Sequence, residues 1–289
     1  MDLCRALRNE AWEGLTDKGW DLPDERLVTG AYGTTHVFHW PGDGVPIVLI
    51  HGAQTDPLMW APLIAELDPS RSIYAPNTPG DPGESVQTEA IADVEGLNEW
   101  LEETLDSLDL DRVHLVGCSY GGWVALHYAA TRPPTIASLT LIEPVVDRIR
   151  PKFHVHGIGS GLAMSIPGPQ RRPLGRHFDV EFMATNPNWR KLGAMAFMKH
   201  AGRPGLPKFT PIDDAVVAKV SVPTYAIFGA RSPVHHAHDL AVRLSGLNPN
   251  IVTELVARAG HTLAVEQPAT VAALIEWFYD EGGANSGDD

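Results

Sequence analysis

A turn of small residues around Ser119 is the strongest candidate for chemistry in the sequence. Ser119 lies between Gly117 and Gly121, after the apolar run Val113 to Val116 and before a helical pattern over Gly122 to Ala130. A sharp turn from strand to helix strains the backbone of the serine and projects its hydroxyl, and small residues two positions to either side prevent a clash. The spacing therefore predicts a nucleophilic serine at position 119.

A serine hydroxyl needs a base to take its proton near neutral pH, and the sequence offers a histidine late in the chain. His261 follows the run Ile251 to Val256 and the loop Ala257 to Gly260, and it precedes the last helical pattern. We therefore predict that His261 is the general base.

An oxyanion that forms during attack on a carbonyl needs two backbone N–H donors. Tyr120 directly follows the nucleophile and would supply the first. Ala53 would supply the second, because it follows the apolar run Pro46 to Ile50 and Gly52 lets the backbone approach closely. We expect His51 to have a structural role in that turn.

These features together resemble the α/β-hydrolase superfamily, in the branch that carries a lid. The resemblance rests on the His-Gly pair at 51–52, the turn at Ser119 and the Gly-His pair at 260–261, and it spans roughly residues 45–278. That branch includes carboxylesterases, epoxide hydrolases, haloalkane dehalogenases and cofactor-free haloperoxidases. Dehalogenases and epoxide hydrolases attack with a carboxylate, so the serine here implies an acyl-serine intermediate.

The triad acid departs from the usual pattern of this superfamily. The usual position is the third residue after Gly229, where this chain has Ser232. Some lid-bearing relatives carry the acid at the end of the strand before the lid, and Glu143 holds that position, 24 residues after Ser119. We take Glu143 as the first candidate, although a carboxylate there also serves structure in relatives with an ordinary acid. In one alternative, Ser232 or a water takes the place of the acid. In the other, the acid is another carboxylate, such as Asp147, Asp214 or Asp239.

The elements that would position these residues follow a regular alternation. Short apolar runs rich in β-branched residues alternate with helical patterns, which predicts the α/β class, a mostly parallel sheet with helices on both faces. An antiparallel pair is expected over Arg26 to Trp40, and the resemblance implies an eight-stranded type of sheet. The expected strands are 46–50, 72–75, 113–116, 138–142, 224–228 and 251–256, and the expected helices are 58–67, 88–108, 122–130 and 269–279.

The stretch 145–211 breaks this alternation, and we interpret it as an inserted helical lid. It would divide the core into residues 1–144 and 212–281, with a polar tail at 282–289. The stretch holds eleven Lys or Arg and three acids, a net charge of +8 against −22 elsewhere, which would attract an anionic substrate if the bases face the pocket. Its apolar side chains form either a roof over the pocket or a small core of the lid itself: Phe153, Phe178, Phe182, Trp189, Phe197, Met164, Met183, Met195 and Met198.

The overall composition excludes several classes of partner. The net charge of −14 argues against nucleic acid, and no apolar run is long enough to span a membrane. The N-terminus lacks the pattern of a secretory signal and there are two cysteines, so we expect a cytoplasmic protein. Cys118 is expected to be a small buried residue rather than a catalytic thiol.

The histidine clusters do not predict a metal site. The patterns at 154–156 and 235–238 lack an acidic or cysteine partner at diagnostic spacing, and we expect no metal and no cofactor. Asn77 stands where the superfamily often has an aspartate, and we expect this to affect only the turn that follows. The oligomeric state stays open.

The sequence as a whole predicts hydrolysis of a carboxylic ester, lactone or thioester through an acyl intermediate on Ser119. The substrate would be a small and largely apolar molecule, either neutral or anionic. Two alternatives stay open: a carbon-carbon bond hydrolase or tailoring enzyme of specialised metabolism on the same scaffold, and a non-catalytic ligand-binding or receptor protein.

Overall fold

The fold is built on one central sheet. The computed structural model describes residues 2–166, 168–178, 180–187, 190 and 205–282. Within this part of the chain the strand order is β1-β2-β4-β3-β6-β7-β8-β9, and β5 pairs with β2. The pairs of β2 with β1, β4 and β5 are antiparallel, whereas β3, β4 and β6 to β9 run parallel. The strands are β1 (Asp24–Gly30), β2 (Gly33–Trp40), β3 (Asp43–Ile50), β4 (Arg71–Asn77), β5 (Val86–Gln87), β6 (Val113–Cys118), β7 (Ile136–Ile142), β8 (Thr224–Gly229) and β9 (Ile251–Val256).

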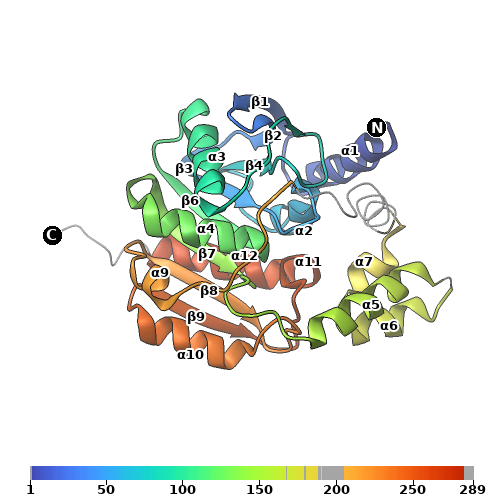
Figure 1. Ribbon diagram of the computed structural model, residues 1–289. Coiled ribbons are helices and arrows are strands. Elements are labelled where there is room, and N and C mark those ends of the chain that lie inside the picture. Colours follow the sequence, from blue (N-terminus) through green and yellow to red (C-terminus); the bar gives the residue numbers. More distant parts are fainter. Residues whose placement is uncertain (1, 167, 179, 188–189, 191–204, 283–289) are drawn as a thin grey trace.

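Helices cover both faces of this sheet (Figure 1). One face packs against α3, α4, α9 and α10, and the other against α1, α2, α11 and α12. The helical elements are α1 (Asp2–Thr16), η1 (Pro57–Trp60), α2 (Ala61–Ile64), α3 (Val94–Ser107), α4 (Tyr120–Thr131), η2 (Pro133–Thr135), α5 (Lys152–Ser165), α6 (Arg171–His177), α7 (Glu181–Thr185), α9 (Asp214–Ala218), α10 (Ala237–Leu247), α11 (Leu263–Glu266), α12 (Pro268–Trp277) and η3 (Phe278–Gly282).

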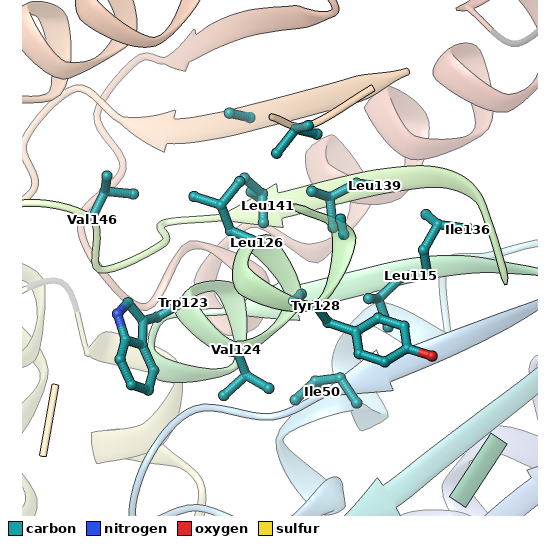
Figure 2. Close-up of a cluster of buried hydrophobic side chains, with 14 of the residues drawn as sticks. Ile50, Leu115, Trp123, Val124, Leu126, Tyr128, Ile136, Leu139, Leu141 and Val146 are labelled. Carbon is teal, nitrogen blue, oxygen red and sulfur yellow. The ribbon is translucent and has the colours of Figure 1, made fainter. Parts of the chain in front are cut away.

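The two-layered core follows from the two-residue period of the strands. In β3, Val48 and Ile50 face the α4 side, whereas Ile47 and Leu49 face the α12 side, and all four are buried. Because successive side chains of a strand point to opposite faces, a strand covered on both sides must be apolar throughout. Figure 2 shows the α4 side of this arrangement, where side chains of α4 such as Trp123 and Leu126 lie among those of the strands.

The α/β class and the mostly parallel sheet are confirmed. All six parallel strands expected from the sequence are present, and the antiparallel pair is formed by β1 and β2 with Ala31 and Tyr32 in the turn. The pattern expected as one helix over 58–67 is a short 3-10 turn, η1, followed by α2. The N-terminal helix α1 and the short strand β5 were not anticipated.

Helices α5, α6 and α7 lie in the chain between β7 and β8, where the lid was predicted. They form a group at the side of the body that contains the sheet (Figure 1). Ala163, Val180 and Ala184 form a small core of this group, with Met164, Leu174, Phe178 and Met183 packed against it. The predicted lid residues Trp189, Met195, Phe197 and Met198, and the tail from residue 283 onward, lie outside the described residues. No described helix combines the length and the apolar character needed to cross a membrane.

Candidate active site

The predicted site residues lie at the carboxyl ends of neighbouring parallel strands. Cys118 at the end of β6 pairs with Ile142 at the end of β7, and Ile142 pairs in turn with Ile227 of β8. Ser119 and Glu143 are therefore the next residues beyond two strands that end at the same level. The carboxyl edge of a parallel sheet is where ligands bind in open α/β folds, because the loops that follow the strands converge there.

Ser119 is held in a strained turn between β6 and α4. Its backbone has φ 54° and ψ −116°, a conformation that costs a non-glycine residue about 1–3 kcal/mol. The turn is fixed by the Ser119 N–H, which donates to Ile142 O at 3.1 Å, and by Ser119 O, which accepts from Trp123 N at 3.1 Å. A Cβ atom on Gly117 would collide with the Gly121 carbonyl, so the small residue expected there is required.

A chain of hydrogen bonds joins Ser119, His261 and Glu143. His261 Nε2 lies 2.9 Å from Ser119 Oγ, and His261 Nδ1 lies 3.0 Å from Glu143 Oε2. An ionised carboxylate only accepts hydrogen bonds, so it fixes the tautomer in which Nδ1 carries the proton and Nε2 is free to accept the serine proton. The structure therefore brings together the three residues that the sequence proposed as nucleophile, base and acid.

Glu143 is fully buried and remains a carboxylate. Burial opposes its ionisation, but the nearby rings of His235 and His261, together with the hydrogen bond to His261, outweigh that effect and lower the pKa of Glu143 to about 2. His235 is itself buried, and its Nε2 lies 3.3 Å from Glu143 Oε1. The two atoms lack the alignment of a hydrogen bond, so we regard His235 as an electrostatic neighbour of the carboxylate.

The alternative acids from the sequence do not contact His261. Ser232 donates its hydroxyl to Glu143 Oε2 at 2.6 Å, so it supports the carboxylate and does not replace it. Asp147 and Asp214 both bind the guanidinium of Arg243. The Asp239 side chain is 78% exposed and lies 3.7 Å from His238.

The loop after β3, which carries the predicted oxyanion donor Ala53, lies against Ser119. A Cβ atom on Gly52 would stand 3.4 Å from the Cβ of Ser119, which shows how closely the two backbones approach. Ala53 and Tyr120 both line the cavity at Ser119. Tyr120 is the first residue of α4, and the N–H groups of the first helical turn have no partner within their own helix.

Two buried side chains fix the shape of this loop. His51 Nε2 accepts the N–H of Thr78 at 3.0 Å, and its Nδ1 lies 3.0 Å from Gly52 O, in agreement with the structural role expected for it. Asp81 accepts the N–H of Gln54 at 2.8 Å, at a residue with φ 59°. The sequence carried no signal for this contact, which joins residues 27 positions apart.

Asn77 closes the turn after β4, as expected. Its side-chain amide donates to Pro82 O at 2.7 Å, and its side-chain oxygen accepts from Ser85 N at 2.9 Å. Asn77 is buried, and its side-chain amide also lies 3.4 Å from His51 Nε2, in the loop beside Ser119. The departure from the usual aspartate is therefore accommodated by the turn together with His51.

A cavity of about 590 Å³ opens over Ser119 and His261. Most of its lining is apolar, and the ring of Phe153 meets the His261 ring edge-on at 5.7 Å. Phe153 and Met183 from the predicted lid line the cavity, whereas Phe178 packs in the small core of α5 to α7. Some of the lid side chains therefore cover the pocket, and others form a core of the lid itself. Further apolar lining residues are Met59, Val145, Ile149, Leu206, Phe209, Val234 and Val265.

The histidines considered as metal ligands do not form a cluster of three or more ligands among the described residues. His235 lies beside Glu143, and the His238 side chain is 78% exposed. A different group, Glu25, His36 and Glu84, has ligand-type atoms within 4.8 Å of one another. Arg8 already donates to Glu84 at 2.8 Å and to Asp56 at 3.2 Å, so a guanidinium balances the charge of that group.

Cys118 beside Ser119 is buried, as expected. Burial raises the pKa of its thiol to about 12, and the charge of Glu143 adds to the effect. A thiol in this state is a poor nucleophile near neutral pH, because the reactive species is the thiolate.

Comparison with known proteins gives a consistent result. Residues 47–274 match the profile of a family described as "Alpha/beta hydrolase family". Carboxylesterase YbfK of Bacillus subtilis is 26% identical over 261 residues, which cover 87% of this chain and 86% of that protein. An uncharacterised carboxylesterase named nap, also of Bacillus subtilis, is 24% identical over 264 residues, which cover 88% and 85%.

A solved structure supports the fold over almost the whole length. The crystal structure of naproxen esterase from Bacillus subtilis superposes with a TM-score of 0.78 at 22% sequence identity. The superposition covers 94% of this chain and 96% of that chain. The correspondence therefore includes the sheet and its helices rather than a local motif.

Proposed function

The chain belongs to the alpha/beta hydrolase family, and from that premise we propose that it is a serine hydrolase that cleaves a carboxylic ester, with lactones and thioesters as related substrates. The observation that supports this most is the unbroken chain of hydrogen bonds from Ser119 through His261 to Glu143 at the floor of a cavity. Two carboxylesterases are relatives over most of their length, which favours an ester bond.

The proposed reaction has two halves that use the same groups. Ser119 Oγ attacks the carbonyl carbon while His261 Nε2 takes its proton, and the oxyanion accepts the N–H groups of Ala53 and Tyr120. The bond to the leaving alcohol breaks, the alcohol leaves with the proton from Nε2, and the acyl group stays on Ser119. Water then attacks the acyl-enzyme, His261 accepts the water proton and returns it to Ser119, and the free acid departs. Glu143 stabilises the imidazolium in both halves.

The proposed substrate is small and largely apolar. The volume of about 590 Å³ is in the range of small-molecule sites, and most of the side chains that line the cavity are apolar. The lining also includes polar side chains, among them Gln54, Thr55, Asp81 and Thr262. An ester with an apolar part and a more polar part fits this mixed lining.

Covalent labelling is the first test of this proposal. A fluorophosphonate should react rapidly with the native protein and, after digestion and mass spectrometry, be found on Ser119, because the reagent traps a serine that has a base beside it. The variant His261→Ala should lose the labelling, and His238→Ala, which changes an exposed histidine, should keep it. A folded protein that takes up no label would contradict the proposal and favour a ligand-binding role.

The side chain of Lys208 bears on the charge of the proposed substrate. Lys208 is exposed, and among the described residues it is the one Lys or Arg that lines the cavity. It forms no ion pair with a carboxylate of the described residues. The whole protein carries −14 and repels anions, so a local cation at the cavity would be needed to accept one. We propose that Lys208 favours esters with a carboxylate on the part remote from the scissile bond.

Salt dependence tests this role of Lys208. For a monoester of a dicarboxylic acid, kcat/KM should fall about three- to tenfold as salt rises to about 0.5 M, whereas a neutral ester of equal length should change little, because salt screens charges that face solvent. Lys208→Gln should remove the difference, and Lys219→Gln, an exposed lysine outside the cavity lining, should keep it. Equal salt responses of the two esters in the unaltered protein would reject the role.

A further inference from the structure

The segment that follows β8 encloses the carboxylate of Glu143. Oε1 accepts the N–H of Gly229 at 2.6 Å, and Oε2 accepts the hydroxyl of Ser232 at 2.6 Å. Oε2 is also the oxygen that lies 3.0 Å from His261 Nδ1. A fully buried carboxylate is costly unless donors satisfy its oxygens, and here each oxygen has at least one donor from this segment.

The hydroxyl of Ser232 is directed at that oxygen by its own surroundings. Ser232 is only 6% exposed, and its N–H donates to Gly229 O at 3.0 Å, which fixes the turn. The N–H of Val234 points at Ser232 Oγ from 3.3 Å, so one lone pair of the hydroxyl is occupied. The hydroxyl has one proton to donate, and Glu143 Oε2 is the acceptor within reach.

We propose that Ser232 is a positioning residue of the reaction: its hydroxyl holds Glu143 Oε2 at the distance and angle that His261 Nδ1 requires. This rests on the proposed function. Without the hydroxyl the carboxylate would keep the Gly229 and His261 contacts but lose the donor that orients Oε2. Ser232 does not line the cavity, so it acts on turnover through Glu143 and has no direct contact with substrate.

The same geometry predicts that an aspartate at position 232 could replace the carboxylate of Glu143. In a serine-to-aspartate change, the carboxyl carbon takes the place of Oγ, and its oxygens extend about 1.2 Å further. Since Oγ is already 2.6 Å from Oε2, an aspartate oxygen would come close to the place of Oε2 once the Glu143 side chain is removed. A carboxylate carried at position 232 should then reach His261 Nδ1.

The first test compares two replacements of Ser232. Ser232→Ala should lower kcat about tenfold and leave KM within about twofold, because a hydrogen bond to a charged group is lost while the cavity is unchanged. Ser232→Thr keeps the hydroxyl and should recover most of kcat. Ser245→Ala, which removes an exposed hydroxyl bonded within α10, is the matched control. An unchanged kcat in a folded Ser232→Ala protein, or a loss of kcat in Ser232→Thr equal to that in Ser232→Ala, would overturn the proposal.

The second test moves the acid. Glu143→Ala should be nearly inactive, and adding Ser232→Asp should raise its kcat at least about tenfold, whereas adding Ser232→Asn should not, because an amide cannot balance the imidazolium charge. Fluorophosphonate titration counts the competent sites in each variant. No recovery in a folded double variant, or equal recovery with asparagine, would reject the placement of Ser232. Full activity of Glu143→Ala alone would instead reject the proposed acid, so the two failures are distinct.

Discussion

The variant Ser119→Ala is expected to lose ester turnover by a factor on the order of 10⁵ to 10⁶ in kcat, as removal of the nucleophile does in other serine hydrolases. The proposed reaction requires a covalent bond to Oγ, and no neighbouring group replaces it. Cys118 is adjacent in the chain, but burial raises the pKa of its thiol to about 12, so hardly any thiolate is present near neutral pH.

The measurement is kcat on a neutral ester with the enzyme concentration set by fluorophosphonate titration of the unaltered protein. Ser119 is strained at φ 54°, and alanine is strained in the same way, so the unfolding midpoint in urea should change little. Ser245→Ala should keep full turnover, since it changes a serine on the outer surface of α10. Retained turnover in a clean preparation of Ser119→Ala would place the nucleophile elsewhere.

Much of the fold could be predicted because the local patterns and the global arrangement agree. The runs that became β3, β6 and β8 are mostly apolar, with His114 and Thr224 as polar exceptions, as expected of strands buried on both faces. The turn at Ser119 could be found because its glycines are required by contact between backbones: a Cβ on Gly121 would collide with the Ile50 carbonyl. Because no larger residue fits at such a position, the requirement is visible in the sequence as a glycine.

The sequence could not choose among the candidate acids, because the contact with His261 depends on which strands are neighbours in the sheet. Glu143 is 24 residues from Ser119 in the chain, but the pairing of Cys118 with Ile142 puts the two side by side. The same holds for Ser232, whose contact with Glu143 spans 89 positions. Sequence reasoning treated these two residues as alternatives, whereas the structure joins them by a hydrogen bond.

Sequence patterns also missed elements whose partners are remote. The helix α1 packs through Trp12 and Leu15 against the α12 side of the sheet, and a turn at Gly19, with φ 91°, follows it. Lys208 was seen only as part of the positive charge of the predicted lid. Its place at the cavity arises because the last part of the predicted lid segment lies beside Tyr120, whose hydroxyl donates to Pro207 O at 2.8 Å.

The variant Glu143→Gln is expected to lower kcat by about 10³- to 10⁴-fold with little change in KM. The pKa of Glu143 is about 2, so the native residue is charged at every pH at which turnover would be measured, and the variant removes that charge throughout. The amide oxygen of glutamine can still accept the N–H of Gly229. Its NH₂ group would then face His261 Nδ1 and make that nitrogen an acceptor, which forces the proton onto Nε2. A protonated Nε2 cannot take the proton of Ser119.

This outcome separates the loss of the acid from a general loss of structure. Ser119 and the oxyanion donors stay in place in Glu143→Gln, so slow fluorophosphonate labelling at Ser119 should persist while turnover falls. Two control variants remove other carboxylates: Asp147→Asn removes one that binds Arg243, and Asp239→Asn removes one that is exposed. Both variants should keep kcat within about twofold of the native value. If Asp147→Asn instead matched the loss in Glu143→Gln, the charge around Arg243 would matter more than the hydrogen bond to His261. If Glu143→Gln kept a normal rate, the carboxylate would have a structural role only, and His261 would act without an acid partner.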